Sequence, residues 1–158
     1  ETEKVLVGND LVLIAPAKSA VNSVDIAKGE WINALKDSYL SVGDPAHVPA
    51  GQYAEEALTK LNLWDKVQER LARAKDVRGA LALVERAEAP YGIVYSTDAK
   101  VSQQVKTVAV FPADSHKPVV YPVSIVKGHD NADSRDFLKY LESDAAKKVL
   151  VGYGFSAK

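Results

Sequence analysis

The sequence predicts an α/β fold in which a mixed, mostly parallel sheet is flanked by helices. Strand-like and helix-like segments alternate along the chain, Pro and Gly clusters separate them, and no repeat or low-complexity stretch interrupts them. With 158 residues, the chain is long enough for one well-packed core or for two small lobes.

The composition excludes several classes of function. Twenty Lys and Arg residues nearly balance 21 Asp and Glu residues, so no basic excess suits a general nucleic-acid or membrane-surface binder. The chain has no Cys, which excludes disulfides, thiolate metal sites and cysteine nucleophiles. No apolar run approaches the roughly 20 residues that a membrane-spanning helix needs.

The first quarter of the chain contains short elements. Apolar runs at 4–7 and 11–15 flank the turn-forming residues 8–10 and predict two strands. Helical spacing of apolar residues at 29–36 predicts a short helix, and residues 39–43 predict a third strand.

The middle of the chain is predominantly helical by pattern. From Gly51 a helical face is formed by Tyr53, Ala54, Ala57, Leu58 and Leu61. Residues 63–71 predict another helix, and Asp76 is a suitable N-cap for a helix over 77–87.

The last part of the chain returns to strands and closes with helices. Residues 91–95 are aromatic and β-branched, which predicts a strand ending at Tyr95. Residues 104–111 and 119–126 predict two more strands, with a hairpin turn at 112–117 between them. Two closing helices are predicted from apolar residues at helical spacing: Phe137, Leu138 and Leu141, then Ala145, Ala146, Val149 and Leu150.

Two helix starts are the best candidates for a binding site. In α/β sheets, ligands bind outside the carboxyl ends of strands, where helices begin and offer unpaired N–H groups to anions. The stretch "VGDPAHVPAG" (42–51) leads into a helix without a Ser, Thr, Asp or Asn cap. The second start is Asp76-Val77, and the hydroxyl of Tyr95 is a further possible donor.

Each of these signals also has a purely structural interpretation. A Pro-rich loop is most often only a turn. Asp76 is more often an ordinary helix cap than part of a binding site, and a tyrosine at a strand end most often contributes to packing. Arg78 is another possible anion ligand, but an Arg just inside a helix is more often a surface ion-pair partner.

The sequence signals for an enzyme are weaker than those for a binding site, and we expect no enzymatic activity. His47, His116 and His129 are far apart in sequence and have no metal-ligand spacing. Asp114-Ser115-His116 contains the residue types of a catalytic triad, but triad members meet in space rather than in sequence, so we interpret it as the hairpin turn. Gly-rich phosphate-binding loops are absent.

Four long segments resemble periplasmic molybdate-binding proteins of ABC uptake systems. They are "VGDPAHVPAGQYAEEALTKL", "DVRGALALVERAEAPYGIVYSTDA", "FPADSHKPVVYPVSIVKGH" and "FLKYLESDAAKKVLVGYGF". The resemblance implies a type II periplasmic binding protein whose two lobes close on molybdate or tungstate, with delivery to a membrane permease. It implies no cofactor and no nucleic-acid partner.

The resemblance also implies the ligand set of one lobe. Matched residue by residue, the donors are the Ala50 amide in "HVPAG", the Val77 amide in "DVRG" and the Tyr95 hydroxyl in "GIVY". Pro49 has no N–H, so Ala50 carries the first free donor of its helix, and Gly51 is expected to leave room for an oxyanion.

The chain departs from the family at its beginning. No Met occurs, the chain opens with Glu1-Thr2-Glu3, and the serine-containing loops that supply the family's other ligands are not found. We therefore expect a processed or truncated chain that lacks the N-terminal part of the first lobe. Residues 1–9 would be the crossover from that lobe, 10–118 the second lobe, and 119–158 the returning strand and C-terminal helices of the first lobe.

Two hypotheses follow from this incomplete first lobe. With half of the donors missing, the chain should bind molybdate poorly. The unpartnered apolar faces of the closing helices should favour self-association or helix swapping. Two alternative functions stay open: a binding protein for sulfate or another tetrahedral oxyanion, and the effector-sensing domain of a transcription regulator.

Overall fold

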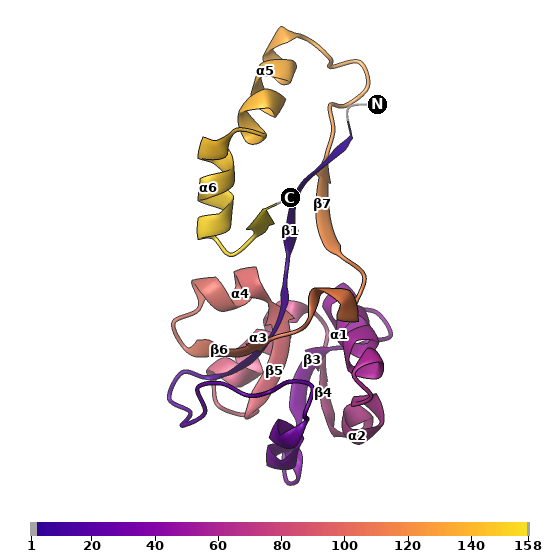
Figure 1. The fold of residues 1–158 in the computed structure, drawn as a ribbon, viewed down its shortest axis with the longest axis vertical. Helices are drawn as coiled ribbons and strands as arrows, with labels where there is room; N and C mark the ends of the chain where they lie inside the picture. Colours follow the sequence, from indigo (N-terminus) through magenta and orange to yellow (C-terminus); the bar gives the residue numbers. More distant parts are fainter. Residues whose placement is uncertain (1–2, 158) are drawn as a thin grey trace. The chain divides into compact units, whose positions relative to one another are not determined.

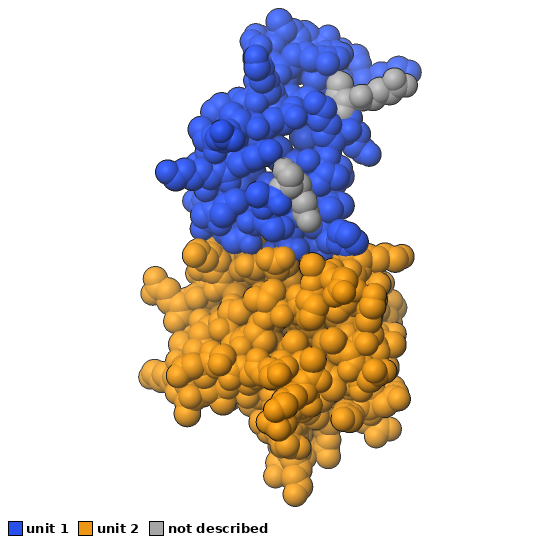
Figure 2. Space-filling view, viewed as in Figure 1, with its two compact units in different colours: residues 1–9, 118–158 blue, residues 10–117 orange. Residues whose placement is uncertain are grey.

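The chain divides into two compact units in the computed structural model, which describes residues 3–157. Unit 1 consists of Glu1–Asn9 and Pro118–Lys158, and unit 2 of Asp10–Lys117 (Figures 1 and 2). The chain therefore passes into unit 2 after Asn9 and returns to unit 1 at Pro118. No helix among the described residues is long and apolar enough to span a membrane.

Unit 2 is built on a five-stranded sheet with strand order β4-β3-β5-β2-β6. The strands are β2 (Leu11–Pro16), β3 (Leu40–Gly43), β4 (Leu71–Ala74), β5 (Tyr91–Tyr95) and β6 (Val105–Val110). β3 pairs in parallel with β4 and β5, whereas β2 pairs antiparallel with β5 and β6. The mixed sheet is thus confirmed, but the parallel pairs are half of the total rather than most, because β2 runs against both of its neighbours.

The alternation of side chains along β2 divides the core of unit 2 between the two faces of the sheet. Leu11, Leu13 and Ala15 belong to one apolar cluster, while Val12 and Ile14 belong to the other. All five are at most 2% exposed, so both faces of this strand are covered.

Helices pack on both faces of this sheet. They are η1 (Glu30–Leu35), α1 (Pro49–Lys60), α2 (Trp64–Val67), η2 (Gln68–Arg70), α3 (Val77–Glu85), α4 (Ser96–Val101) and η3 (Ala113–Ser115), where η denotes a 3-10 helix. α1 buries Ala54, Ala57 and Leu58 in the cluster that holds Leu13. α3 buries Ala80 and Val84 in the cluster that holds Ile14.

Three predicted elements of unit 2 need correction. The helix expected over 63–71 ends earlier, and its last residue begins the edge strand β4 (Leu71–Ala74), whose Ala-rich sequence has little strand propensity. The short helix near residue 30 is a 3-10 helix. The expected hairpin at 112–117 is wrong, because β6 and the next strand belong to different sheets.

Unit 1 contains a small antiparallel sheet and two helices. The strands β1 (Lys4–Asn9), β7 (Val119–Val123) and β8 (Ser156–Ala157) have the order β7-β1-β8. The closing helices are α5 (Ala132–Leu141) and α6 (Asp144–Gly152), as the apolar spacing predicts. Asn131 and Ser143 cap their N-termini by accepting hydrogen bonds from the Ser134 and Ala146 amides.

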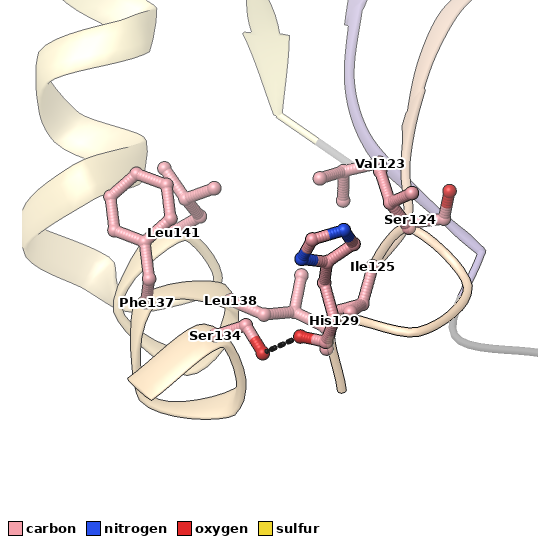
Figure 3. Close-up of a pocket in the computed structure, with 9 residues that line it drawn as sticks. Val123, Ser124, Ile125, His129, Ser134, Phe137, Leu138 and Leu141 are labelled. Atoms are coloured by element: carbon pink, nitrogen blue, oxygen red, sulfur yellow. Dashed lines mark hydrogen bonds between the residues drawn. The ribbon is translucent and has the colours of Figure 1, made fainter. Parts of the chain in front are cut away.

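An apolar groove with a volume of about 430 Å³ lies between the end of β7 and helix α5 (Figure 3). We call it the α5 groove; its lining is Val123, Ser124, Ile125, Val126, His129, Ser134, Phe137, Leu138 and Leu141. The Ser134 hydroxyl donates a hydrogen bond of 2.6 Å to the His129 carbonyl across one end of it. Phe137 is 62% exposed and Val126 is 69% exposed, so much of the apolar surface of unit 1 has no cover within the described chain.

Candidate oxyanion-binding site

Three neighbouring parallel strands end at one edge of the unit 2 sheet. β4, β3 and β5 are adjacent and run in the same direction, so their carboxyl ends lie side by side. A hydrogen bond of 2.8 Å from the Asp44 N–H to the Ala74 carbonyl joins the ends of β3 and β4. This edge carries the start of α1, the start of α3 and Tyr95, which are the three places that the sequence singled out.

The loop between β3 and α1 satisfies its own amides before the helix begins. The Asp44 carboxylate accepts from the Ala46 N–H at 3.0 Å, and the Asp44 carbonyl accepts from His47 and Val48. The Ala46 N–H lowers the pKa of Asp44, and the guanidinium of Arg73, 3.3 Å away, lowers it further. The turn is thereby fixed without using any donor of the helix itself.

The first turn of α1 has no side-chain cap, as the sequence predicts. Val48 occupies the N-cap position in an extended conformation, and Pro49 follows as the first helical residue. Among the described residues, no acceptor is present for the Ala50 N–H. Ala50 itself is only 1% exposed, so its amide lies at a helix start packed into the sheet edge.

Gly51 serves a different purpose from the one expected. A Cβ at this position would lie 2.0 Å from the Gly43 carbonyl oxygen, which is backbone and cannot move aside. Gly51 therefore allows α1 to pack against the end of β3, and the space it leaves is already filled by protein rather than open to an oxyanion.

The start of α3 combines a capped and an open amide. The Asp76 carboxylate accepts a hydrogen bond of 2.7 Å from the Gly79 N–H, which confirms the predicted N-cap. Val77 is a half-buried residue, and no acceptor for its N–H occurs within residues 3–157. The Asp76 side chain thus occupies one donor of the first turn and leaves the Val77 amide open.

Tyr95 is the last residue of β5 and is half-buried. Its N–H donates to the Asp98 carboxylate at 3.0 Å, which holds the start of α4. Burial raises the pKa of Asp98, while the Tyr95 N–H and the charge of Arg78 act in the opposite direction. The backbone of Tyr95 is therefore fixed at the start of α4, and its ring also has an aromatic neighbour on α1.

Two residues near this site escaped the sequence analysis. Tyr53 was assigned only to the apolar face of α1, yet its ring contacts that of Tyr95, with centroids 6.4 Å apart. Asp98 was not singled out, although it holds the backbone of Tyr95. The i to i+3 spacing of Tyr53 from Ala50 is a signal that could have identified the first of these.

The three histidines do not meet. His47 is exposed in the loop before α1, His116 is buried near Tyr53, and His129 lines the α5 groove of unit 1. Throughout the described part of the chain, no group of three His, Cys, Asp or Glu side chains is placed to hold a metal ion. The candidate groups at the sheet edge are the Ala50 and Val77 amides and the side chain of Tyr95.

Comparison with known proteins places the whole chain among solute-binding proteins. It is 98% identical over all 158 residues to the molybdate-binding protein ModA of Haemophilus influenzae, and 52% identical to that of Escherichia coli. It spans 62% of the length of each of these relatives. The solved substrate-binding domain of a putative molybdenum ABC transporter from Clostridium difficile is 38% identical, with a TM-score of 0.86 over 99% of this chain and 67% of that one.

A family model agrees with these relatives over nearly the full sequence. The model for bacterial extracellular solute-binding proteins matches residues 1–156. The chain therefore belongs to the family of bacterial extracellular solute-binding proteins.

Proposed function

We propose that this chain is part of an extracytoplasmic substrate-binding protein that captures molybdate for uptake by an ABC transporter. The observation that carries the proposal is the pair of open amides, Ala50 and Val77, at the ends of neighbouring parallel strands, next to the strand that ends at Tyr95. The named relatives from H. influenzae and E. coli support molybdate as the ligand.

The donor set fits a tetrahedral dianion that must later be released. Helix starts attract anions through unpaired N–H groups and the helix dipole, without a full positive charge. The Tyr95 hydroxyl adds a neutral donor, so the anion would form several hydrogen bonds but no ion pair. Molybdate and tungstate have the same charge and shape, and we propose that the site accepts both.

We propose that residues 10–118 form one ligand-binding lobe, and that residues 1–9 and 119–158 belong to the other. The chain spans 62% of the length of the molybdate-binding relatives. The residues that complete the donor set would then come from the part of those proteins that this sequence does not include.

The binding experiment compares two chain lengths. We expect calorimetry to show tight binding of one molybdate by a protein of the relatives' full length that contains this sequence. The 158-residue chain should bind weakly, because only one lobe's donors would be present. Tight one-to-one binding by the short chain would contradict the divided site.

Sulfate is the alternative ligand, because it is also a tetrahedral dianion. Thermal unfolding of the full-length protein with molybdate, tungstate and sulfate in turn would distinguish them. A ligand at about 100 times its Kd should stabilise the fold by about 2.7 kcal/mol. Selectivity would arise from cavity size and fixed donors, so sulfate should stabilise much less; equal stabilisation by sulfate would overturn the assignment of molybdate.

The proposed partners and location follow from the same role. We propose the periplasm as the location and a membrane permease as the partner, both testable by cell fractionation and by co-purification with the transporter. The exposed apolar side chains of unit 1, among them Phe137 and Val149, favour self-association of the short chain. Light scattering that gives a monomer at high concentration would contradict this last expectation.

A further inference from the structure

Tyr53 lies one helical turn after the open Ala50 amide. Residues three apart share a helix face, and helical side chains lean toward the N-terminus. The ring of Tyr53 is therefore directed back over the first turn of α1, where no acceptor for the Ala50 N–H occurs among the described residues.

The Tyr53 ring has two aromatic neighbours from distant parts of the sequence. Its centroid is 6.4 Å from that of Tyr95, with 68° between the planes, and 5.8 Å from that of His116, with 63° between the planes. Both values lie in the range of favourable edge-to-face contacts. Tyr53 thus connects the helix that offers the Ala50 amide with the strand end that offers the Tyr95 hydroxyl.

His116 is itself held firmly in this position. It is 8% exposed, and its ring Nδ1 donates a hydrogen bond of 2.8 Å to the Lys117 carbonyl, which can only accept. The Lys117 N–H donates to the Glu56 carboxylate at 3.0 Å, and Glu56 lies one turn after Tyr53 on α1. The segment that carries His116 is therefore attached to α1 at two neighbouring positions.

We propose that Tyr53 is a positioning residue for the Tyr95 hydroxyl, with His116 as the side chain that keeps Tyr53 in place. A tyrosine hydroxyl lies far from its backbone, so small rotations of the side chain about the Cα–Cβ bond move it by a large fraction of a hydrogen-bond length. The Asp98 carboxylate accepts from the Tyr95 N–H and fixes its backbone, and the edge contact from Tyr53 restricts its ring. This inference rests on the proposed function, in which the Tyr95 hydroxyl contacts the oxyanion.

The first test needs no ligand. NMR of the 158-residue chain with labelled tyrosine reports the ring resonances of Tyr95, which depend on the neighbouring ring. We expect Tyr53→Leu to shift and broaden them, whereas Tyr53→Phe, which keeps the ring, should leave them nearly unchanged. Unchanged Tyr95 resonances in Tyr53→Leu would overturn the positioning role.

The second test measures molybdate affinity by calorimetry in a full-length protein that contains this sequence. Tyr53→Leu should weaken binding about two- to tenfold, the equivalent of one edge-to-face contact, and Tyr53→Phe should restore it. In a Tyr95→Phe background, Tyr53→Leu should cause no further loss, because the hydroxyl to be positioned is absent.

Each other outcome has a defined meaning. An equal loss from Tyr53→Leu in both backgrounds, or a full loss from Tyr53→Phe, would overturn the proposal, since Tyr53 would then act independently of Tyr95. If Tyr53→Leu does not fold, His116→Leu should weaken binding in the same Tyr95-dependent way, and no effect would count against the inference. Absence of molybdate binding by the unmodified full-length protein would refute the proposed function, while the NMR result would still decide the ring contact.

Discussion

Single residues at the sheet edge determine which backbone groups are used by the fold and which stay open. Asp76 accepts from the Gly79 N–H and Asp44 accepts from the Ala46 N–H. Neither carboxylate reaches the Ala50 or Val77 amide, for which no acceptor occurs within residues 3–157. Individual side chains therefore determine which backbone N–H groups at this edge have an acceptor within the chain and which do not.

Replacing Asp76 tests the cap of α3. Asp76→Ala removes the acceptor of the Gly79 N–H and should destabilise the protein by about 1 kcal/mol, measured by urea denaturation followed through Trp31 and Trp64, which both lie in unit 2. Asp76→Asn keeps an acceptor and should stay within a few tenths of a kcal/mol of the unmodified chain. Equal losses in both variants would show that the charge, rather than the cap, is responsible.

Replacing Gly51 tests the close contact between α1 and β3. Gly51→Ala places a Cβ 2.0 Å from the Gly43 carbonyl oxygen, so α1 must shift, and we expect a loss of about 1–3 kcal/mol or more. Gly152→Ala is the matched control in helix α6, where an added Cβ meets nothing within 4 Å. It should stabilise unit 1 slightly, as judged by circular dichroism, because Ala favours the helix. A neutral Gly51→Ala would contradict the packing described for α1.

At the scale of elements, the sequence predicted those that carry clear boundary signals. α1 and α3 were found because Pro49 and Asp76 mark their starts, and β5 because its residues are aromatic and β-branched. The strand β4 and the helix α4 were not found, because one is an Ala-rich edge strand and the other is a single six-residue helix after a strand.

Part of the candidate site could be predicted from the sequence, again where local signals mark it. The two helix starts and the strand end could be read from local patterns and from the family resemblance. The contacts of Tyr53 with Tyr95 and His116 could not, because they join residues more than 40 positions apart and depend on the strand order. The direction of β2 depends on strand pairing in the same way, which is why the sheet is less parallel than expected.

The start of α4 should give stability a specific dependence on pH. Burial raises the pKa of Asp98 above its usual 3.8, so the folded state holds this proton more tightly than the unfolded state does. Stability should therefore fall as pH rises from 3.8 through the raised pKa, and Asp98→Asn should flatten that part of the stability–pH curve.

Asp44 provides a control in the opposite direction. Its pKa is lowered by the Ala46 N–H and by Arg73, so its contribution is present above pH 3.8 and is lost as pH falls through the lowered value. Asp44→Asn should therefore lower stability by a constant amount above pH 3.8 and change the slope of the curve only below pH 3.8. If Asp98→Asn changed the slope of the stability–pH curve only below pH 3.8, the buried environment of Asp98 would be contradicted.

At the scale of the whole molecule, unit 2 is an insertion within unit 1. Its two ends lie close together, because the Phe111 N–H donates a hydrogen bond of 2.9 Å to the Leu11 carbonyl and β2 pairs with β6. Residues 10–117 also contain both apolar clusters that cover the faces of the five-stranded sheet.

Unit 2 should therefore fold without unit 1. We expect residues 10–117, expressed alone, to show a cooperative urea transition and the tertiary circular-dichroism signal of Trp31 and Trp64. Residues 118–158 alone should remain largely unfolded, since β1 is the central strand of their sheet and would be missing. A disordered 10–117 fragment would show that unit 2 depends on unit 1.

The antiparallel pairing of β1 with β7 has a mechanical consequence. Lys4 lies opposite Val123, and Asn9 lies opposite Val119, so the Asn9–Val119 end of the pair is the one from which the chain enters and leaves unit 2. A force that pulls the two strands apart from the Lys4–Val123 end must break their hydrogen bonds one after another, and tension reaches residues 10–117 only after the last has opened. Under such a load, the β1–β7 pair would open first, and the sheet edge that bears Ala50, Val77 and Tyr95 would carry no force until it had opened.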